Sequence, residues 1–296
     1  MIIGVFGNSF NSDADIFVQE FIELLENAGC QLYIYEPFFR FAKNKIKFRN
    51  IPDTFKSNSD IYNKINILFS IGGDGTLLET LRIVRDSGIP TTGINLGRLG
   101  FLATISKEGI KPAVDEILSG NYIIDSRSTL ELITKNNTFA NNNFALNEIT
   151  VHKKESSTMM TIRCSIDGEY LNSYWADGII ISTPTGSTGY SLSCNGPILL
   201  PESQTFIINP IASHNLTVRP VVLPDNKVIT LNIEQRHKKF MVSLDSRTES
   251  FDSYEEITIR KSHIKFNFIK LKDQSFYSTI RNKLLWGLDM RKTEIT

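Results

Sequence analysis

Short apolar runs alternate with segments of helical periodicity over the first hundred residues. The expected strands lie at residues 2–6, 32–35, 65–71 and 91–94. Between them, apolar residues recur at helical spacing over 17–28, before Gly29, and over 77–84, before Gly88. The run over 65–71 is nearly all apolar, which is typical of a strand buried on both faces of a parallel sheet. This alternation predicts a Rossmann-like α/β domain whose site lies at the carboxyl ends of its strands.

After a helix expected over 111–118, the pattern changes to short β-rich runs separated by Asn-, Gly-, Asp- and Pro-bearing turns. These runs lie at residues 130–134, 144–152, 160–166, 178–182, 207–209, 228–234, 240–244 and 256–259. They predict an antiparallel, β-sandwich-like domain over 121–269, following the α/β domain over 1–120. The tail, 270–296, is expected to pack back on the first domain. The polar segment 39–63 is expected to be mainly loop.

Composition narrows the class of protein. The 296 residues carry 32 Lys+Arg and 32 Asp+Glu, a formal net charge of zero, which argues against a nucleic-acid partner bound by bulk electrostatics. No apolar run approaches the roughly 20 residues that span a bilayer, and the first residues lack the basic region of a signal peptide. Three cysteines without paired spacing indicate neither a disulfide framework nor a zinc site. We therefore expect a cytoplasmic protein with no membrane partner.

The first candidate site is the turn GGDGT, residues 72–76, between a buried strand and a helix. Glycines let backbone N–H groups turn toward a phosphate, and a helix N-terminus adds partial positive charge. Asp74 in such a turn suits a base for an attacking hydroxyl or a holder of Mg²⁺, while a simple N-cap aspartate is the alternative. The spacing matches neither a Walker A loop nor the GxGxxG fingerprint.

Two further segments combine polar side chains with turns. In GINLGRLGFL, residues 93–102, Asn95 would bind a ligand or pin the turn, and a hinge with packing glycines is the stronger interpretation of this segment alone. Asn147 and Glu148 interrupt an apolar β run, and ordinary turn polarity is the slightly favoured interpretation of this segment alone. They would grip one ribose diol together only at a strand end or bulge, because adjacent strand side chains point to opposite faces.

The richest segment is residues 177–193, DGIIISTPTGSTGYSLS, in which a buried strand opens into small and hydroxylated residues. Hydroxyls and amides at this density suit phosphate or ribose oxygens, and Tyr190 can stack on a base. A plain Ser/Thr loop is the alternative, and ligand binding is the favoured interpretation because the loop directly follows a buried strand. A nucleophilic serine is not indicated, since no GxSxG elbow occurs. The four histidines show no metal-ligand spacing, so no residue is assigned to a metal.

Taken together, residues 65–245 resemble the NAD kinase family. The GGDGT turn is shared with diacylglycerol kinases, sphingoid-base kinases and phosphofructokinases. Other segments are more specific to the family and come in its order: GINLGRLGFL, LNE, DGIIISTPTGSTGYSLS and the later INPIASH with Arg219-Pro220. The resemblance implies transfer of the γ-phosphoryl group of ATP, with Mg²⁺ or another divalent cation, to the 2′-hydroxyl of the adenosine ribose of NAD.

The resemblance also implies roles for individual residues. Asp74 would be the base, and Asn147 and Glu148 would bind the nicotinamide-side ribose. The remaining residues implied to contact NAD or ATP are Gly72, Gly73, Gly75, Thr76, Asn95, Asp177, Thr185, Thr188, Gly189, Tyr190, Ser193 and Asp245. Asp177 would come from a neighbouring subunit, since family members are usually homodimers or homotetramers with a site shared across the interface.

Three positions depart from the family pattern: Gly189 replaces the usual Ala, Cys194-Asn195-Gly196 replaces a glycine-rich stretch, and Ser246 follows Asp245 where most members have Gly. These departures affect the expected affinity for substrate and the orientation of the bound substrate, but not the class of reaction. Two rival interpretations are a lipid or sugar kinase that shares only the GGDGT turn and a catalytically silent dinucleotide sensor. The 177–193 loop and Asn147-Glu148 argue against the first, and the presence of Asp74 argues against the second.

Overall fold

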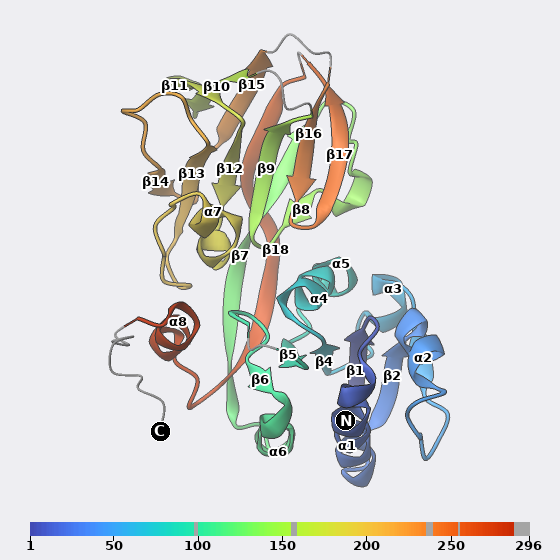
Figure 1. The fold of residues 1–296 in the computed structure, drawn as a ribbon. Helices are drawn as coiled ribbons and strands as arrows, with labels where there is room; N and C mark the ends of the chain where they lie inside the picture. The colour runs from blue at the N-terminus through green and yellow to red at the C-terminus, as the bar shows by residue number, and fades with distance from the viewer. Residues whose placement is uncertain (98–99, 155–158, 235–238, 254, 287–296) are drawn as a thin grey trace. The chain divides into compact units, whose positions relative to one another are not determined.

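The computed structural model describes residues 1–97, 100–154, 159–234, 239–253 and 255–286. Contacts divide the chain into two compact units, one formed by 1–125 with 267–296 and the other by 126–266 (Figure 1). The sequence placed the corresponding boundaries at 120 and 270. Over the described residues, no helix has both the length and the apolar character needed to cross a membrane.

The first unit contains a parallel sheet in the order β3-β2-β1-β4-β5, with the short β6 parallel to β5. Its strands are β1 (Ile2–Gly7), β2 (Gln31–Tyr35), β3 (Asp53–Phe55), β4 (Ile67–Ile71), β5 (Thr91–Asn95) and β6 (Ile105–Ser106). Its helices are η1 (Ser12–Ala14), α1 (Asp15–Asn27), α2 (Glu36–Ala42), α3 (Asn58–Ile61), α4 (Asp74–Glu79), α5 (Leu81–Val84), η2 (Lys107–Gly109), α6 (Ile110–Leu118) and α8 (Phe276–Leu284).

Burial explains why these segments fold as they do. Every residue of β4 is buried, as expected for a central parallel strand. Helix α1 buries Val18, Phe21, Ile22 and Leu25, one stripe at helical spacing, and the chain turns at Gly29 with φ +71°. Because the strands are parallel, the carboxyl ends of β4 and β5 lie at the same edge of the sheet, where the glycine-rich segments begin.

The second unit is built from two antiparallel sheets. One has the order β14-β13-β12-β9-β16-β17, and the other has β11-β10-β15-β18, with β7 pairing β18 and β8. The strands are β7 (Tyr122–Thr134), β8 (Phe144–Ala145), β9 (Glu148–Lys153), β10 (Met160–Ile166), β11 (Glu169–Ala176), β12 (Gly178–Ser182), β13 (Thr205–Ile211), β14 (Val221–Pro224), β15 (Ile229–Glu234), β16 (Lys239–Leu244), β17 (Arg247–Asp252) and β18 (Ile257–Leu271). Three short helical segments complete it: η3 (Ala140–Asn142), η4 (Thr185–Thr188) and α7 (Tyr190–Ser193).

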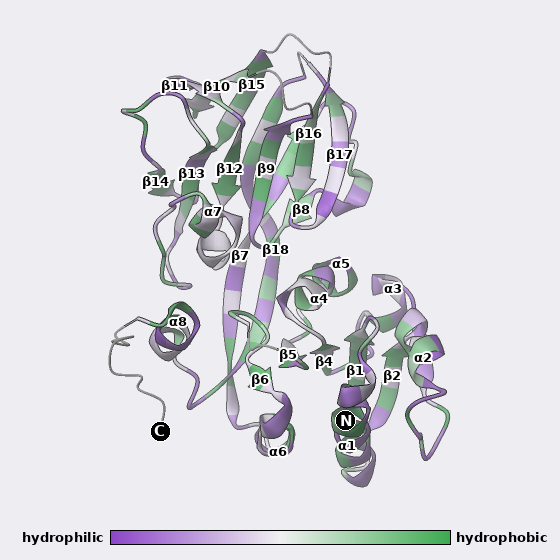
Figure 2. Ribbon diagram, viewed as in Figure 1, coloured by the Kyte–Doolittle hydropathy of each residue, from purple (hydrophilic) through white to green (hydrophobic). Residues whose placement is uncertain are grey.

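A single apolar core joins the two sheets of this unit. Residues from strands of both sheets, such as Ile149 and Ile181 from one and Ile162 and Leu231 from the other, belong to the same buried cluster. Hydrophobic residues recur along the strands of this unit (Figure 2). Along β9, buried Ile149 and Val151 belong to the core, whereas Glu148, Thr150 and His152 alternate with them and lie on the opposite face of the sheet. The predicted fold class, an α/β domain followed by an antiparallel β domain, is confirmed.

Several details of the prediction were wrong. Segment 39–63 is mainly loop, as expected, but the pattern missed α2, β3 and α3, which are too short to show a clear period. The single helix expected over 77–84 is interrupted at Thr80, whose hydroxyl donates to the carbonyl of Leu77 at 2.6 Å. In the second unit the strands that the pattern missed are β11, β14 and β17. All three lie at sheet edges. Most residues of β11 and β17 are exposed or half-buried, and β14 is only four residues long.

Candidate functional site

The GGDGT turn connects β4 to α4 in the first unit. Gly72 has φ +150°, and a Cβ there would lie 2.4 Å from the Thr76 hydroxyl oxygen, so this position requires glycine. Gly73 and Gly75 differ, because a Cβ at either would meet no atom of the described residues within 4 Å. Their backbone is therefore open to an approaching ligand, and Asp74 between them begins α4.

The Asp74 carboxylate accepts three hydrogen bonds from consecutive backbone N–H groups. Phe101 donates to Oδ2 at 2.8 Å, while Leu102 and Ala103 donate to Oδ1 at 3.1 and 2.8 Å. The carboxylate is therefore fixed by main chain that follows β5. The segment that resembled a hinge in the sequence is the segment that holds Asp74.

Asn95 stabilises the turn at the end of β5. Its Oδ1 accepts the N–H of Gly97 at 2.8 Å, and the residue is 3% exposed. Of the two interpretations left open by the sequence, this bond matches the pinning of the turn. A ligand contact by Asn95 stays a prediction.

Asn147 and Glu148 lie at the start of β9 in the second unit, where the carboxylate of Asp245 binds their backbone. Asp245 accepts the N–H groups of Leu146, Asn147 and Glu148 at 2.9, 2.8 and 3.2 Å, and its own N–H donates to the Glu148 carbonyl at 3.0 Å. Asp245 itself adopts φ +51° in the turn from β16 to β17. The residue with a left-handed backbone conformation in this turn is thus Asp245. It is not Ser246, the position at which most family members have glycine.

Two buried acceptor atoms in this region have no hydrogen-bond partner among the described residues: Asn147 Oδ1 and Glu148 Oε2. Buried acceptors of this kind are costly unless a ligand or water satisfies them. Burial, together with the neighbouring Asp245 carboxylate, raises the pKa of Glu148 to about 8, and the Tyr190 N–H offsets part of the effect. Burial also raises the pKa of Asp245, against the effect of its three backbone hydrogen bonds and Arg247.

The loop after β12 uses many of its hydroxyls internally. The Thr183 hydroxyl donates to the Leu146 carbonyl at 2.6 Å and accepts the Gly186 N–H at 3.1 Å. Ser187 donates to the Pro184 carbonyl at 2.7 Å. These bonds fix the loop against the 146–148 segment. The hydroxyl density read from the sequence as ligand-binding is, at these positions, used to shape the loop.

The predicted loop residues differ in accessibility. Thr185 is 5% exposed and accepts a hydrogen bond from Arg127 at 3.2 Å, and Thr188 donates to the Thr185 carbonyl at 3.3 Å. Tyr190 is 45% exposed, and Ser193 is also exposed. A Cβ at Gly189 would lie 2.9 Å from Glu148 Oε2 and 3.4 Å from Asn147 Nδ2, so this glycine leaves room directly beside the Asn147-Glu148 pair.

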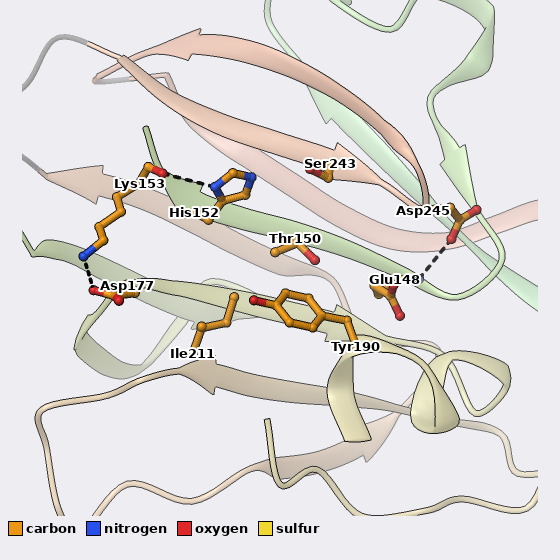
Figure 3. Close-up of a pocket in the computed structure, with 9 residues that line it drawn as sticks. All are labelled: Glu148, Thr150, His152, Lys153, Asp177, Tyr190, Ile211, Ser243 and Asp245. Atoms are coloured by element: carbon orange, nitrogen blue, oxygen red, sulfur yellow. Dashed lines mark hydrogen bonds and ion pairs between the residues drawn. The ribbon is translucent and has the colours of Figure 1, made fainter. Parts of the chain in front are cut away.

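A pocket of about 470 Å³ lies on the face of the six-stranded sheet that carries Glu148, Thr150 and His152 (Figure 3). Lys153 Nζ lies 2.6 Å from Asp177 Oδ1 in this pocket. The pocket brings together four residues predicted from the sequence and five that were not. The first four are Glu148, Asp177, Tyr190 and Asp245; the other five are Thr150, His152, Lys153, Ile211 and Ser243.

A period-of-two pattern could have identified two of the missed residues. Glu148, Thr150 and His152 alternate with buried Ile149 and Val151 along β9, so their side chains share one face. His152 is one of the four histidines that the sequence assigned to no metal site. The predicted residues of the first unit, Gly72, Gly73, Asp74, Gly75, Thr76 and Asn95, belong to the edge of the parallel sheet described above.

Two family models together match most of the chain. The ATP-NAD kinase N-terminal domain matches residues 3–122, and the ATP-NAD kinase C-terminal domain matches residues 146–271. The chain is 44% identical over 292 residues to the NAD kinase of Cytophaga hutchinsonii and 45% identical over 293 residues to that of Flavobacterium psychrophilum. Each alignment covers 98% of this chain and all of the relative.

Solved structures show the same fold. The crystal structure of yeast NADH kinase complexed with NADH has a TM-score of 0.86 and 25% identity, over 99% of this chain and 90% of that chain. The structure of an NAD kinase from Archaeoglobus fulgidus in complex with ATP has a TM-score of 0.74 and 24% identity, over 96% of this chain and 99% of that chain. By the full-length relatives and both family models, this chain belongs to the NAD kinase family of phosphotransferases.

Proposed function

We propose that Asp74 is the base of an NAD kinase reaction. In that reaction the 2′-oxygen of the adenosine ribose of NAD forms a bond to the γ-phosphorus of ATP. The bond from that phosphorus to the β,γ-bridging oxygen breaks, ADP leaves, and the hydroxyl proton passes to Asp74. The observation that carries the assignment is the carboxylate at the open glycine turn, fixed by three backbone N–H groups. Positioning of this kind supplies most of the rate in phosphoryl transfer.

The pocket on the six-stranded sheet would bind NAD. A ribose diol presents two hydroxyl donors, and Asn147 Oδ1 and Glu148 Oε2 are two buried acceptors without partners among the described residues. These atoms support assignment of Asn147 and Glu148 to the nicotinamide-side ribose. The half-exposed ring of Tyr190 borders the same pocket and offers a face on which a base can stack.

The remaining residues are assigned to the ATP phosphates or to the adenine and its ribose. The open backbone at Gly73 and Gly75, with Gly72 and Thr76 shaping the turn, supports binding of the ATP phosphates. Residues near the adenine and its ribose would be Thr185, Thr188, Gly189, Ser193 and Asp177. A homodimer or homotetramer in the cytoplasm, with Asp177 serving a neighbouring subunit's site, stays part of the proposal.

A divalent cation would accompany ATP. Among the described residues, no group of three or more His, Cys, Asp or Glu side chains gathers into a metal site. Mg²⁺ commonly binds through one or two carboxylates together with substrate phosphates, so this chain fits a cation carried by the nucleotide. When bound, the cation neutralises charge developing on the phosphoryl oxygens.

The direct experiment incubates the purified chain with NAD, ATP and Mg²⁺ and detects NADP with an NADP-specific dehydrogenase. The same assay with NADH in place of NAD identifies the phosphoryl acceptor, and with polyphosphate in place of ATP it identifies the phosphoryl donor. Formation of NADP by the wild type and its loss in Asp74→Asn would support the assignment. Binding of NAD with no turnover from either donor would favour the dinucleotide sensor instead.

A further inference from the structure

The hydrogen bonds to Asp74 divide its two carboxylate oxygens unequally. Oδ1 accepts two of them, from Leu102 and Ala103, whereas Oδ2 accepts one, from Phe101. An ionised carboxylate offers about four lone-pair positions, two on each oxygen. Oδ1 is therefore saturated, and among the described residues no donor occupies the second position on Oδ2.

The segment that donates these bonds is held in place by close packing. A Cβ at Gly93 would lie 2.8 Å from the Ala103 Cβ, so β5 contacts this segment directly. The Gly100 N–H points to the Ala103 carbonyl at 3.4 Å, which closes the segment on itself. The three donors thus belong to packed main chain rather than to adjustable side chains.

Gly100 lies directly against the Asp74 carboxylate. A Cβ built there would lie 1.8 Å from Asp74 Oδ1, 2.4 Å from Cγ and 2.6 Å from Oδ2. The atoms in conflict are all at the end of one side chain. An alanine at this position would be accommodated by rotation of the carboxylate, and the backbone could stay where it is.

From this geometry we infer that residues 100–103 are a positioning element for Asp74, and that Oδ2 is the oxygen that takes the proton from the attacking hydroxyl. This inference rests on the proposed role of Asp74 as base. Gly100 is a positioning residue in it: the absence of a side chain at 100 lets the carboxylate reach the three N–H groups. A base must lie within hydrogen-bond reach of its proton, so displacement of Oδ2 lowers the rate without removing substrate contacts.

The test is Gly100→Ala, with Gly97→Ala as the matched control in the same segment. Within the part of the chain that the structure describes, a Cβ at Gly97 would meet only Asn95 Oδ1, at 3.8 Å, which is an ordinary contact. We expect Gly100→Ala to lower kcat by about 10–100-fold, the range that follows from misplacing a catalytic group by about 1 Å. KM for NAD and ATP should stay within about threefold, since the contacts that bind substrate do not change. Gly97→Ala should keep the wild-type kcat.

A double-mutant cycle separates this role from a purely structural one. In an Asp74→Asn background the base is already absent, so Gly100→Ala should lower kcat by less than about threefold. An equal loss in both backgrounds, an unchanged kcat in Gly100→Ala, or a rise in KM at constant kcat would overturn the inference.

Failure of the proposed function would be recognised separately. If Asp74→Asn alone keeps the wild-type kcat, Asp74 is not the base, and the proton-acceptor inference falls with it. The contact between residue 100 and the Asp74 carboxylate is tested independently of activity by measuring Tm. Gly100→Ala should lower the Tm of the wild type and leave the Tm of Asp74→Ala unchanged, because the conflicting atoms are gone. A Tm loss of equal size in both would refute the positioning contact.

Discussion

Replacement of Glu148 by Gln should remove a pH-dependent loss of stability. Glu148 is largely buried beside Asp245, and its pKa is raised from 4.5 to about 8. Between these two values the folded chain holds a proton on Glu148 that the unfolded chain has released. The free energy of unfolding therefore falls as the pH rises through this window. The penalty is absent below about pH 4.5 and fully present above about pH 8.

The size of the effect follows from the shift. Each unit of pKa corresponds to about 1.4 kcal/mol, so a shift of this size amounts to about 5 kcal/mol at most. Gln has nearly the same shape and carries no charge at any pH. We therefore expect the wild type and Glu148→Gln to have similar stability at pH 5, and the variant to be more stable at pH 8.5. The difference in Tm at pH 8.5 should be on the order of 10 °C.

Thermal unfolding of both proteins between pH 5 and pH 9 measures this difference. Glu169→Gln is the matched control, because Glu169 is an exposed glutamate on β11 of the same unit. Its profile should follow that of the wild type. Parallel Tm profiles for the wild type and Glu148→Gln would refute the reasoning, because they would mean that Glu148 titrates alike in the folded and unfolded chain.

Three further predictions concern the two sites. Asp74→Asn should lower turnover by about 10²–10⁴-fold, the usual contribution of a general base, while calorimetric titration still detects NAD binding. Gly186→Ala should lower the free energy of unfolding by about 1–3 kcal/mol, because its Cβ would lie 2.1 Å from the Asn147 carbonyl oxygen; urea unfolding measures this, and an unchanged midpoint would contradict it. Tyr190→Ala should weaken NAD binding about tenfold through loss of an aromatic stacking face worth roughly 1.4 kcal/mol, whereas Tyr190→Phe should bind as the wild type does. Equal affinities for all three proteins would exclude a stacking role for the ring.

The parts of the fold that the sequence predicted are those whose burial creates a strong pattern. Strand β4 is buried on both faces and is a nearly all-apolar run, and β10 and β12 were predicted with their observed bounds. The missed strands β11 and β17 are edge strands with mostly exposed or half-buried residues. An edge strand forms largely because it pairs with its neighbour, so its own residues show little of the hydrophobic pattern that predicts a strand.

The site divides along a similar line. Residue types and local order identified Glu148 and Asp245 as site residues, but nothing local predicts that one binds the backbone of the other across 97 positions of sequence. Thr183 is an example of the opposite error, a polar group wrongly expected to be available. Its hydroxyl was counted among those suited to a ligand, but it donates a hydrogen bond to the Leu146 carbonyl. Hydrogen-bond partners that are distant in sequence decide which polar groups are left for a ligand.

Asp74 and Asp245 share one structural device, an aspartate carboxylate that receives three consecutive backbone N–H groups, from residues 101–103 and from residues 146–148. Every amino acid except proline supplies a backbone N–H. The side chains of these two segments can therefore drift in evolution while the donors that orient the carboxylates persist. Proline is the substitution that such drift must avoid at all six positions. The two aspartates, by contrast, have no such freedom, because each supplies the acceptor in every one of its bonds.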